Sequence, residues 1–546
     1  MRRVPCNSHW HIMAHSSGLI IILNPMELKE SYDYIIIGSG FGGSVSALRL
    51  AEKGYSVLVI EKGKNYRNAD FPKTNWNVRK WFWVPGIKLF GIQKLTFFRH
   101  ITILSGVGVG GGSLVYANTL PRPKSAFFNQ GSWAGLENWE SELAPFYDTA
   151  SKMLGAAENP LLGNSDLALQ KLAQQINRSA CFAPTTVGVF FGEPDKTVED
   201  PYFNGKGPER TGCIHCGACM TGCRKNAKNS LDKNYLHLAQ ELGVTIIPEH
   251  EVTNVKPIGE HGEKGYEITF RQSTKYFSGK KRISAEGVIF SGGVLGTVPL
   301  LLKLRNSSLP YLSPRVGDMI RSNNEALIVN TSIDKNPELH KGLAIGSILE
   351  LDENSHLEPV RYGEGSGFWR LTMLPMVSEK NFFKRIMKLV IILAKSPGSW
   401  LKILFVRDYS KSSSILLFMQ HLDSTLKFRK GIFGTKTRIE KGKAPTPFIP
   451  EAHAIAHAYS KIINARPQII VTETITGIPS TAHILGGACM GKTREEGVTD
   501  SNNKVFGYEN MYVFDGSVIS SNPGVYPSLS ITAICERGVS KIQIKK

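Results

Sequence analysis

A continuous apolar run, Tyr34-Ile-Ile-Ile-Gly38, is the first strong pattern in the chain, and its lack of alternation is typical of a strand that is buried on both faces. A glycine-rich turn follows, then a helical pattern over residues 44–53 and a second apolar run over 56–60. This order predicts a strand, a helix and a second, parallel strand. Two later stretches, 245–252 and 287–293, predict further strands of the same sheet, the second of them leading into a helix.

The turn after the first strand contains the glycines that a dinucleotide requires. It reads Gly38-Ser-Gly40-Phe41-Gly42-Gly43, and Glu61 ends the second strand. The glycines allow a tight turn and a close approach of backbone to a diphosphate at the helix N-terminus, while an acid at the position of Glu61 accepts hydrogen bonds from ribose hydroxyls. That acid disfavours a 2′-phosphate, so the predicted ligand is of the ADP-ribose or FAD type rather than NADP.

The remaining pattern predicts how the domains are built. A Rossmann-like nucleotide-binding domain is assembled from separated segments, 31–70, 101–120, 225–305 and 475–546, and the substrate domain takes 121–224 and 306–474. Residues 71–100 form a basic, aromatic excursion. We expect residues 1–30 to be a disordered tail or the product of a wrong start site, with Met1 and Met26 both open as the true start.

Four further motifs identify a family. A second glycine run, Gly106 to Ser113, includes Gly108, Gly111 and Gly112, and the C-terminal part contains His483-Ile-Leu-Gly-Gly, Asp515-Gly516-Ser and Gly524-Val-Tyr526-Pro527. Together with the first glycine run and Glu61, in this order, they resemble the glucose-methanol-choline (GMC) flavoprotein oxidoreductases, and within them the cholesterol-oxidase-like branch. The resemblance covers nearly all of the chain after Ser31. It implies an α/β fold with an α+β substrate part, whose sheet is mainly antiparallel.

The resemblance also implies a reaction and a set of site residues. FAD would accept hydride from the CH–OH group of a hydrophobic alcohol, most simply a 3-hydroxysteroid or sterol, and His483 would take the hydroxyl proton, a role that suits neutral imidazole. Tyr526 would be its partner. The residues that match FAD positions of the family are Gly38, Gly40, Phe41, Gly42, Gly43, Glu61, Gly108, Gly111, Gly112, Tyr116, Val252, Asp515 and Gly516.

One position departs from the branch. Cholesterol oxidases commonly read Gly-Val-Asn-Pro where this chain has Gly524-Val-Tyr526-Pro527. Tyrosine keeps a hydroxyl but is larger than the amide and reaches further, so either Tyr526 takes over the hydrogen bond or the substrate geometry differs. An acid that would move a proton in steroid isomerisation is not singled out by the sequence, which offers four glutamates: Glu350, Glu353, Glu358 and Glu364.

Four cysteines within eleven residues indicate a second site, which would hold a metal or react through its thiols. Cys213, Cys216, Cys219 and Cys223 have the spacing of a bacterial iron–sulfur run, although Arg224 stands where proline usually follows. An iron–sulfur cluster, a tetrahedral zinc and a thiol or disulfide role all fit this spacing. A cluster would carry single electrons to a redox protein, making the chain a dehydrogenase, whereas without one oxygen is the expected acceptor. A non-redox flavin-binding lyase or a lipid-binding scaffold is the remaining alternative.

The distribution of charge along the chain predicts a surface that binds membranes. The chain has 546 residues and a formal net charge of +19, and its 42% hydrophobic content excludes general disorder. Nearly all of the charge falls in two segments, 71–105 and 380–443, which also contain aromatic or amphipathic sequence. At 100° per residue Lys384, Lys388 and Lys395 share one side of a helix within about 40°, with apolar residues on the other, which indicates a helix lying on an anionic membrane. A buried helix with a solvated basic rim is the alternative.

The same composition excludes other partners and sets a location. No nucleic-acid-binding module accompanies the basic segments, so we expect no nucleic acid. The apolar run near the N-terminus, residues 18–23, is too short for a signal peptide, and no apolar stretch is long enough to span a bilayer. We therefore expect a cytoplasmic protein without a signal peptide, peripheral on the inner face of the membrane.

Overall fold

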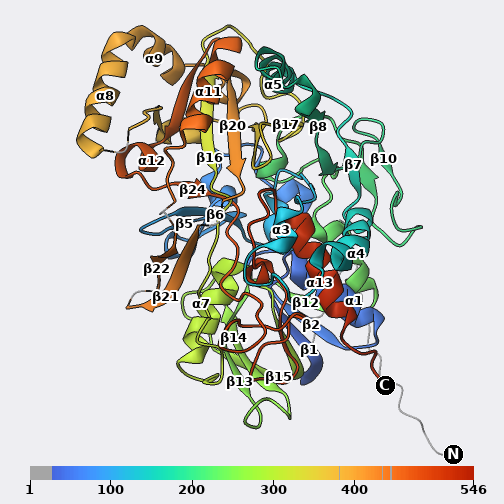
Figure 1. Ribbon diagram of the computed structural model, residues 1–546. Coiled ribbons are helices and arrows are strands. Elements are labelled where there is room, and N and C mark those ends of the chain that lie inside the picture. The colour runs from blue at the N-terminus through green and yellow to red at the C-terminus, as the bar shows by residue number, and fades with distance from the viewer. Residues whose placement is uncertain (1–27, 380, 423, 433, 443–444) are drawn as a thin grey trace, which may run out of the picture.

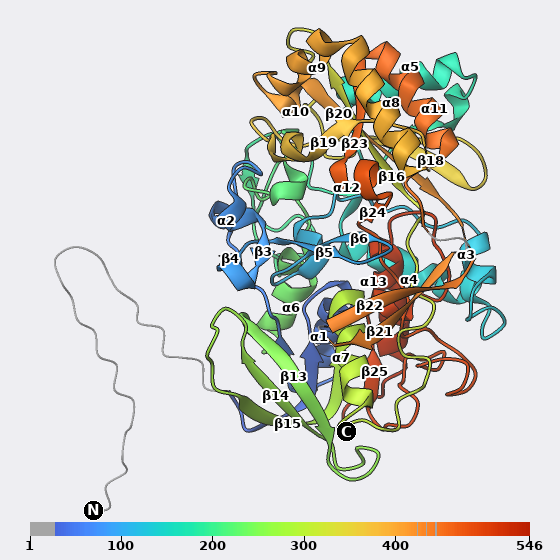
Figure 2. The same cartoon turned by 90° about the vertical axis from the view of Figure 1, so that its left-hand side faces the viewer.

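The computed structural model describes residues 28–379, 381–422, 424–432, 434–442 and 445–546. The tail predicted over residues 1–30 thus lies almost wholly outside the described residues. In Figures 1 and 2 the chain forms two sheets stacked along the long axis of the molecule, with a small sheet between them.

The lower sheet is the predicted nucleotide-binding sheet. Its strands lie in the order β12-β2-β1-β15-β14-β13, with β25 beside β15. β1, β2, β12, β15 and β25 run parallel, whereas β13 and β14 are antiparallel to their neighbours. The bounds are β1 Ser31–Ile37, β2 Val57–Ile60, β12 Thr245–Ile247, β13 His250–Pro257, β14 Tyr266–Gln272, β15 Lys281–Phe290 and β25 Met511–Val513. The sequence prediction of this sheet from distant segments is confirmed.

Helices cover this sheet and complete its core. α1 (Phe41–Glu52) packs against α6 (Tyr235–Glu241) and α13 (Ser528–Ser540), and α13 packs in turn against α4 (Trp139–Met153). Trp139, Leu143 and Tyr147 of α4 are buried in the same apolar core as β1 and β15. α4 therefore packs with the nucleotide-binding part, although the sequence assigned its range to the substrate domain.

The upper sheet is antiparallel throughout, as the resemblance implied. Its strands lie in the order β19-β23-β16-β20-β18-β17-β8. They are β8 Phe182–Pro184, β16 Ala326–Ser332, β17 Ser347–Glu350, β18 Ser355–Val360, β19 Met373–Pro375, β20 Ser413–Gln420 and β23 Ala465–Ile470. α5 (Asn164–Gln175) and α11 (Pro450–Ile462) pack together beside it, and alternate strand residues such as Ile328, Leu357 and Leu416 join their apolar core.

Between the two sheets lies a three-stranded sheet, β5 (Gln93–Phe97), β6 (Thr102–Gly106) and β24 (Ser480–Thr481). β24 runs parallel to β6, with Thr481 opposite Ile103. This pairing matters for function because His483 follows β24 by two residues and the second glycine run begins at the end of β6. Two motifs more than 370 residues apart are thereby brought to one place.

The basic segment 380–443 does not form one unit. It divides into α8 (Phe382–Lys395) and α9 (Pro397–Leu404), at the upper left in Figure 1, α10 (Tyr409–Ser412), β20 and the hairpin β21 (Thr425–Gly431)–β22 (Gly434–Lys441). The hairpin packs against α7 (Val294–Arg305), and Phe428 joins the core of the nucleotide-binding part. Within the described ranges, every helix is too short or too polar to span a bilayer.

Short elements complete the fold. They are α2 (Val78–Trp81), β3 (Trp83–Val84), β4 (Leu89–Phe90), α3 (Ala126–Asn129), β7 (Ala156–Glu158), β9 (Thr186–Gly188), β10 (Thr197–Val198), β11 (Arg210–Thr211) and α12 (Val471–Thr476).

Candidate active site

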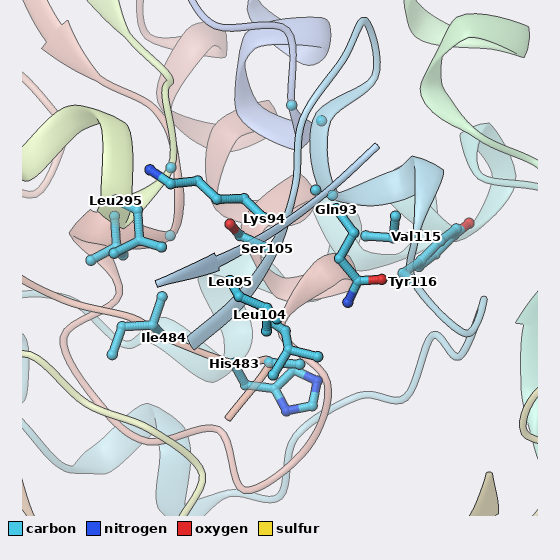
Figure 3. Close-up of a pocket in the computed structure, with 18 of the residues that line it drawn as sticks. Gln93, Lys94, Leu95, Leu104, Ser105, Val115, Tyr116, Leu295, His483 and Ile484 are labelled. Atoms are coloured by element: carbon cyan, nitrogen blue, oxygen red, sulfur yellow. The ribbon is translucent and has the colours of Figure 1, made fainter. Parts of the chain in front are cut away.

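A cavity of about 1200 Å³ runs between the two sheets. It is lined from below by the first glycine run, from the middle by β5 and β6, and from above by β16, β18 and β20. Figure 3 shows part of this lining, from Leu295 and Lys94 at one side to Tyr116 and His483 at the other. The volume exceeds the roughly 300–1,000 Å³ of a typical single-ligand pocket, so the cavity has room for a large cofactor and a bulky substrate.

The loop between β1 and α1 leaves a space for an anion. A Cβ atom at Gly42 would lie 1.7 Å from the carbonyl oxygen of Phe514, and one at Gly43 would lie 2.1 Å from that of Gly38, so neither position accepts a side chain. A Cβ atom at Gly40 meets nothing within 4 Å, since Gly40 borders the cavity. α1 begins here without a side-chain cap or an acid in its first turn, which leaves N–H groups for a ligand. This cradle fits the diphosphate of FAD.

Glu61 lies on the cavity wall, as expected for a residue that binds the ribose of FAD. Its carboxylate is buried and accepts hydrogen bonds from the backbone N–H and hydroxyl of Ser39, at 3.1 and 2.8 Å, and from Gly63 N–H at 2.8 Å. These bonds fix the carboxylate at the cavity wall, where it could also accept hydrogen bonds from ribose hydroxyls. Val252 of β13 lines the same end of the cavity, as the predicted adenine contact requires.

The second glycine run folds over the first. A Cβ atom on Gly111, which has φ +54°, would lie 2.7 Å from the Cα of Gly40, so only glycine allows the two loops this approach. Tyr116 follows on the cavity wall, where its ring meets the ring of Phe41 edge to face at 5.7 Å and its hydroxyl donates to the carbonyl of Asn229 at 3.0 Å. Gly112 also lines the cavity, whereas Gly108, with φ +142°, packs behind it against Leu114 and Tyr66.

The carboxylate of Asp515 accepts its hydrogen bonds from groups of the protein. Its carboxylate accepts from Gly293 N–H at 2.9 Å and from the Thr297 hydroxyl at 2.5 Å, both at the start of α7, and from Ser517 N–H at 2.8 Å. Burial raises the pKa of Asp515, and these bonds oppose the shift. Asp515 and Gly516 both line the cavity, so Asp515 shapes the wall by capping α7 and the turn after β25.

His483 lines the cavity and is held by a carboxylate. Its Nδ1 lies 2.7 Å from Oε2 of Glu325, at the start of β16, and Glu325 Oε1 accepts from Ala482 N–H at 2.7 Å. Burial raises the pKa of Glu325, but the charge and hydrogen bond of His483 outweigh it, so the net pKa is lowered. The Glu325 carboxylate accepts a hydrogen bond from Nδ1–H, so in the tautomer that this pair favours the lone pair of the ring is on Nε2.

Tyr526 stands next to His483. The two rings meet edge to face, with centroids 4.8 Å apart, and both side chains line the cavity. The Tyr526 hydroxyl donates to Glu358 of β18, which is buried behind it. Burial raises the pKa of Glu358 to about 8, so this carboxyl is protonated near neutral pH. The phenol that replaces the usual amide therefore has its donor occupied by Glu358.

The structure separates the four candidate glutamates. Glu358 is buried beside Tyr526, whereas Glu350 pairs with Lys124 at 2.7 Å and Glu364 pairs with Lys411 at 2.7 Å, both near solvent. Glu353 is exposed on the turn before β18. Only Glu358 of the four is close to His483 and Tyr526.

The predicted metal site at the cysteines is not supported. Within the described residues, which include all four cysteines, no group of three or more His, Cys, Asp or Glu side chains is arranged to hold a metal ion. Cys213 and Cys223 pack around Val187, Cys219 packs on the cluster that contains Tyr526, and Cys216 is exposed. Burial raises the pKa of Cys213 and Cys219, so both are protonated thiols near neutral pH. The spacing fits a cluster, but the side chains of the described residues are not arranged as metal ligands.

Sequence reasoning missed two carboxyls of the cavity. Glu325 precedes His483 by 158 residues, and no local motif marks it. Glu473 of α12 also lines the cavity and accepts from Ser480 N–H at 3.0 Å; burial raises its pKa to about 8. An acid at the start of an otherwise apolar strand, as at Glu325, is the one signal that the sequence offered.

Comparisons with known proteins agree with this geometry. Profiles described as GMC oxidoreductase match residues 208–320 and 422–535, and one described as an NAD(P)-binding Rossmann-like domain matches 36–66. Two relatives named cholesterol oxidase are similar over most of the chain. The one from Acinetobacter baumannii is 42% identical over 94% of this chain and 95% of its own, and the one from Mycobacterium tuberculosis is 40% identical over 94% and 91%.

Solved structures with lower identity share the fold. A pyridoxine 4-oxidase from Mesorbium loti aligns with a TM-score of 0.58 and 15% identity over 93% of this chain and 98% of its own, and a fungal aryl-alcohol oxidase aligns with a TM-score of 0.56 and 13% identity over 94% and 99%. With the cradle, the His483 site and the two-sheet fold in place, the chain belongs to the GMC oxidoreductases, a family of FAD-dependent alcohol oxidoreductases.

Proposed function

We propose that this protein oxidises the CH–OH group of a sterol or 3-hydroxysteroid by hydride transfer to FAD, with His483 as the proton acceptor. The observation that carries the proposal is the His483–Glu325 pair on the wall of a cavity that also contains the FAD cradle. The names of the two relatives at 40–42% identity support a sterol as the substrate class. FAD supplies the hydride acceptor.

The part of the cavity near His483 and Tyr526 suits a rigid apolar substrate. Its walls come from the upper sheet and from the aromatic cluster around Trp369, and they offer few polar groups besides His483 and the buried carboxyls. The apolar lining residues here are Val115, Leu327, Val329, Ile345, Val360, Phe368, Trp369, Met373, Ile415, Leu417 and Ile470. Such walls bind by area and shape, while the single hydroxyl of the substrate is oriented by imidazole.

His483 would remove the hydroxyl proton as hydride leaves the same carbon. Among the described residues no hydrogen bond is found for Nε2, whereas Nδ1 is held by Glu325. The ionised carboxylate orients the ring and stabilises the imidazolium that forms after proton transfer. This arrangement needs no second base.

The test is reduction of bound flavin by a sterol without oxygen. In the native protein cholesterol should bleach the flavin absorbance, whereas His483→Ala should keep bound FAD and reduce the bleaching rate by about 100-fold or more. His457→Ala replaces an exposed histidine of α11 outside the cavity; it is the control and should behave as the native protein does. Native rates in His483→Ala would remove His483 from the reaction, and a flavin that no sterol bleaches would overturn the substrate.

We further propose that molecular oxygen is the electron acceptor. The relatives are named oxidases, and the cysteines form no ligand group that would hold an electron-transfer cluster. One hydrogen peroxide should form for each sterol oxidised in air. Flavin that stays reduced in air but is reoxidised by an added redox protein would contradict this proposal.

The substrate would come from an anionic membrane surface, to which α8 and α9 are suited. These helices expose an apolar ridge, which consists of Phe383, Met387, Val390, Ile391, Leu401, Leu404 and the adjoining Phe405. Phe383 and Phe405 are 80% and 75% exposed, and Lys384, Lys388, Lys395 and Lys402 flank them. Apolar side chains beside lysines fit the boundary between acyl chains and anionic head groups.

The ridge lies beside one end of the cavity. Arg385 of α8 is buried and donates to the carbonyl of Ile475 at 2.9 Å, which fixes α8 against α12. Val471 and Thr472 of α12 line the cavity near the solvent, as does the exposed Phe97 at the tip of β5. A protein docked through α8 would thus hold this end of the cavity near the lipid.

Liposome flotation tests the membrane proposal. Phe383→Ser with Phe405→Ser should lower binding to vesicles that contain phosphatidylserine, and salt should weaken the binding of the native protein. Phe277→Ser is the matched control, because Phe277 is fully exposed on the turn between β14 and β15, outside α8 and α9. Equal flotation of both variants, or indifference to lipid charge and salt, would contradict the proposal.

A further inference from the structure

Lys94 of β5 is a cation on the cavity wall without an anionic partner. Its side chain runs across the cavity toward Leu295 at the start of α7 (Figure 3). Within the described part of the chain, no hydrogen bond or ion pair is found for its ammonium group. The position is partly buried, so water satisfies this charge less well than it does on the surface.

The charged neighbours of Lys94 do not neutralise it. Lys62, which follows Glu61 on the same cavity wall, is a like charge that lowers the pKa of Lys94, and Glu251 of β13 is an opposite charge that raises it. Glu251 is half-exposed and already pairs with Arg271 at 3.4 Å. Burial and Lys62 together lower the pKa of Lys94 to about 8. The ammonium group is thus in a setting that favours an anionic ligand.

Lys94 lines the same cavity as the cofactor cradle. Lys94 lies opposite Ser105 in the β5–β6 pair, and Ser105 leads directly to Gly106 and the second glycine run. That run touches Gly40 of the first cradle loop. At the start of α7, toward which Lys94 extends, the carboxylate of Asp515 already accepts from Gly293 N–H and the Thr297 hydroxyl, so it is not free to pair with lysine.

We infer that Lys94 is the counter-cation of the FAD diphosphate, reaching the cradle from the basic excursion. The diphosphate is the only anionic group of FAD, and the first glycine loop offers it backbone N–H groups but no charged side chain. Lys94 supplies the missing positive charge from β5, on the wall of the cavity that the first glycine loop also lines. Binding of the cofactor would then hold β5 and the preceding excursion closed over it. The inference concerns FAD and is independent of the alcohol that is oxidised.

The experiment measures FAD retention by the holoenzyme, through FAD released into ultrafiltrates over a dilution series. Lys94→Met should weaken FAD binding by about tenfold or more, the effect of losing a charge-assisted hydrogen bond, while Lys94→Arg should keep native affinity. Lys88→Met is the control, because Lys88 lies on the same excursion but is exposed outside the cavity, and it should retain FAD as the native protein does.

Two further readouts identify the phosphate as the target. ADP should displace FAD from the Lys94→Met protein less effectively than from the native one, relative to adenosine, which lacks phosphate. The FAD dissociation constant of the native protein should rise between pH 8 and pH 10, as Lys94 of the free site loses its proton, and Lys94→Arg should not show this rise. If Lys94→Met retained FAD as well as Lys88→Met, or lost adenosine and ADP equally, the inference would fail.

Discussion

Two sides of the same cavity each hold a buried glutamate, and the two carboxyls differ in charge. Glu325 bonds to His483, and its pKa is lowered. Glu358 bonds to Tyr526, and its pKa is raised to about 8. Both are almost completely buried, at 4% and 1% exposure, so burial alone does not set their charge.

The partner decides the difference. Desolvation raises the pKa of both carboxyls, but imidazole can take up a proton and then stabilises a carboxylate through charge as well as a hydrogen bond. A phenol stays neutral and provides only the hydrogen bond. The His483 side is therefore equipped for proton transfer, and the Tyr526 side is a neutral hydrogen-bonded wall at pH 7.

The largest effect is expected for Glu325→Gln. The amide keeps the size of the side chain but carries no charge, and it can hold imidazole in the wrong tautomer, so turnover should fall by about 100-fold or more with FAD still bound. Steady-state kcat on the sterol and the flavin spectrum measure the two outcomes.

Glu473→Gln provides the matched control for that loss. Glu473 is also a buried carboxyl of the cavity, but its pKa of about 8 makes it neutral at pH 7, so an amide changes its charge little. A loss of turnover in Glu473→Gln equal to that in Glu325→Gln would show that any buried carboxyl of the cavity matters and would remove the distinction drawn for His483.

A smaller effect is expected for Tyr526→Phe. The ring and its contact with His483 remain, and only the hydroxyl that donates to Glu358 is lost. We expect kcat to fall by less than about tenfold, because the base and its carboxylate are intact. A loss as large as that of Glu325→Gln would mean that the phenol touches the substrate hydroxyl, and a rise in KM alone would place it in binding.

The sequence predicts the nucleotide-binding unit better than it predicts the residues around His483. The β1–α1–β2 unit was predictable because its strand, glycine turn, helix and Glu61 are consecutive. His483 and Tyr526 were found through motifs, but Glu325 was not, since its bond to His483 depends on β16 and β24 meeting in the tertiary structure. Among the four glutamates, only the fold distinguishes Glu358 from those that pair with surface lysines.

The spacing of the four cysteines predicted a metal site that the fold does not support. The four cysteines have ligand spacing, yet within the described part of the chain they belong to no group of side chains arranged to hold a metal ion. The basic segment 380–443 shows the same limit, because its composition is uniform while its helices and hairpin pack on different parts of the molecule. Composition reports the net charge of a segment, but its partners are set by tertiary packing.

The smallest effect is expected in the thermal stability of Glu358→Gln. The pH dependence of its Tm tests directly whether the carboxyl of Glu358 is neutral in the folded protein. The carboxyl has a pKa of about 8 in the folded protein, against about 4.3 in the unfolded chain. Between these values the folded state holds more protons than the unfolded state, so this group makes the native protein less stable as pH rises from about 4.3 to 8. Glutamine does not titrate, and Tyr526 can still donate to its carbonyl oxygen. The Tm of Glu358→Gln relative to the native protein should therefore increase by roughly 1–3 °C from pH 5 to pH 8. A difference in Tm that stays constant with pH would show that Glu358 is already ionised, and the contrast with Glu325 would then disappear.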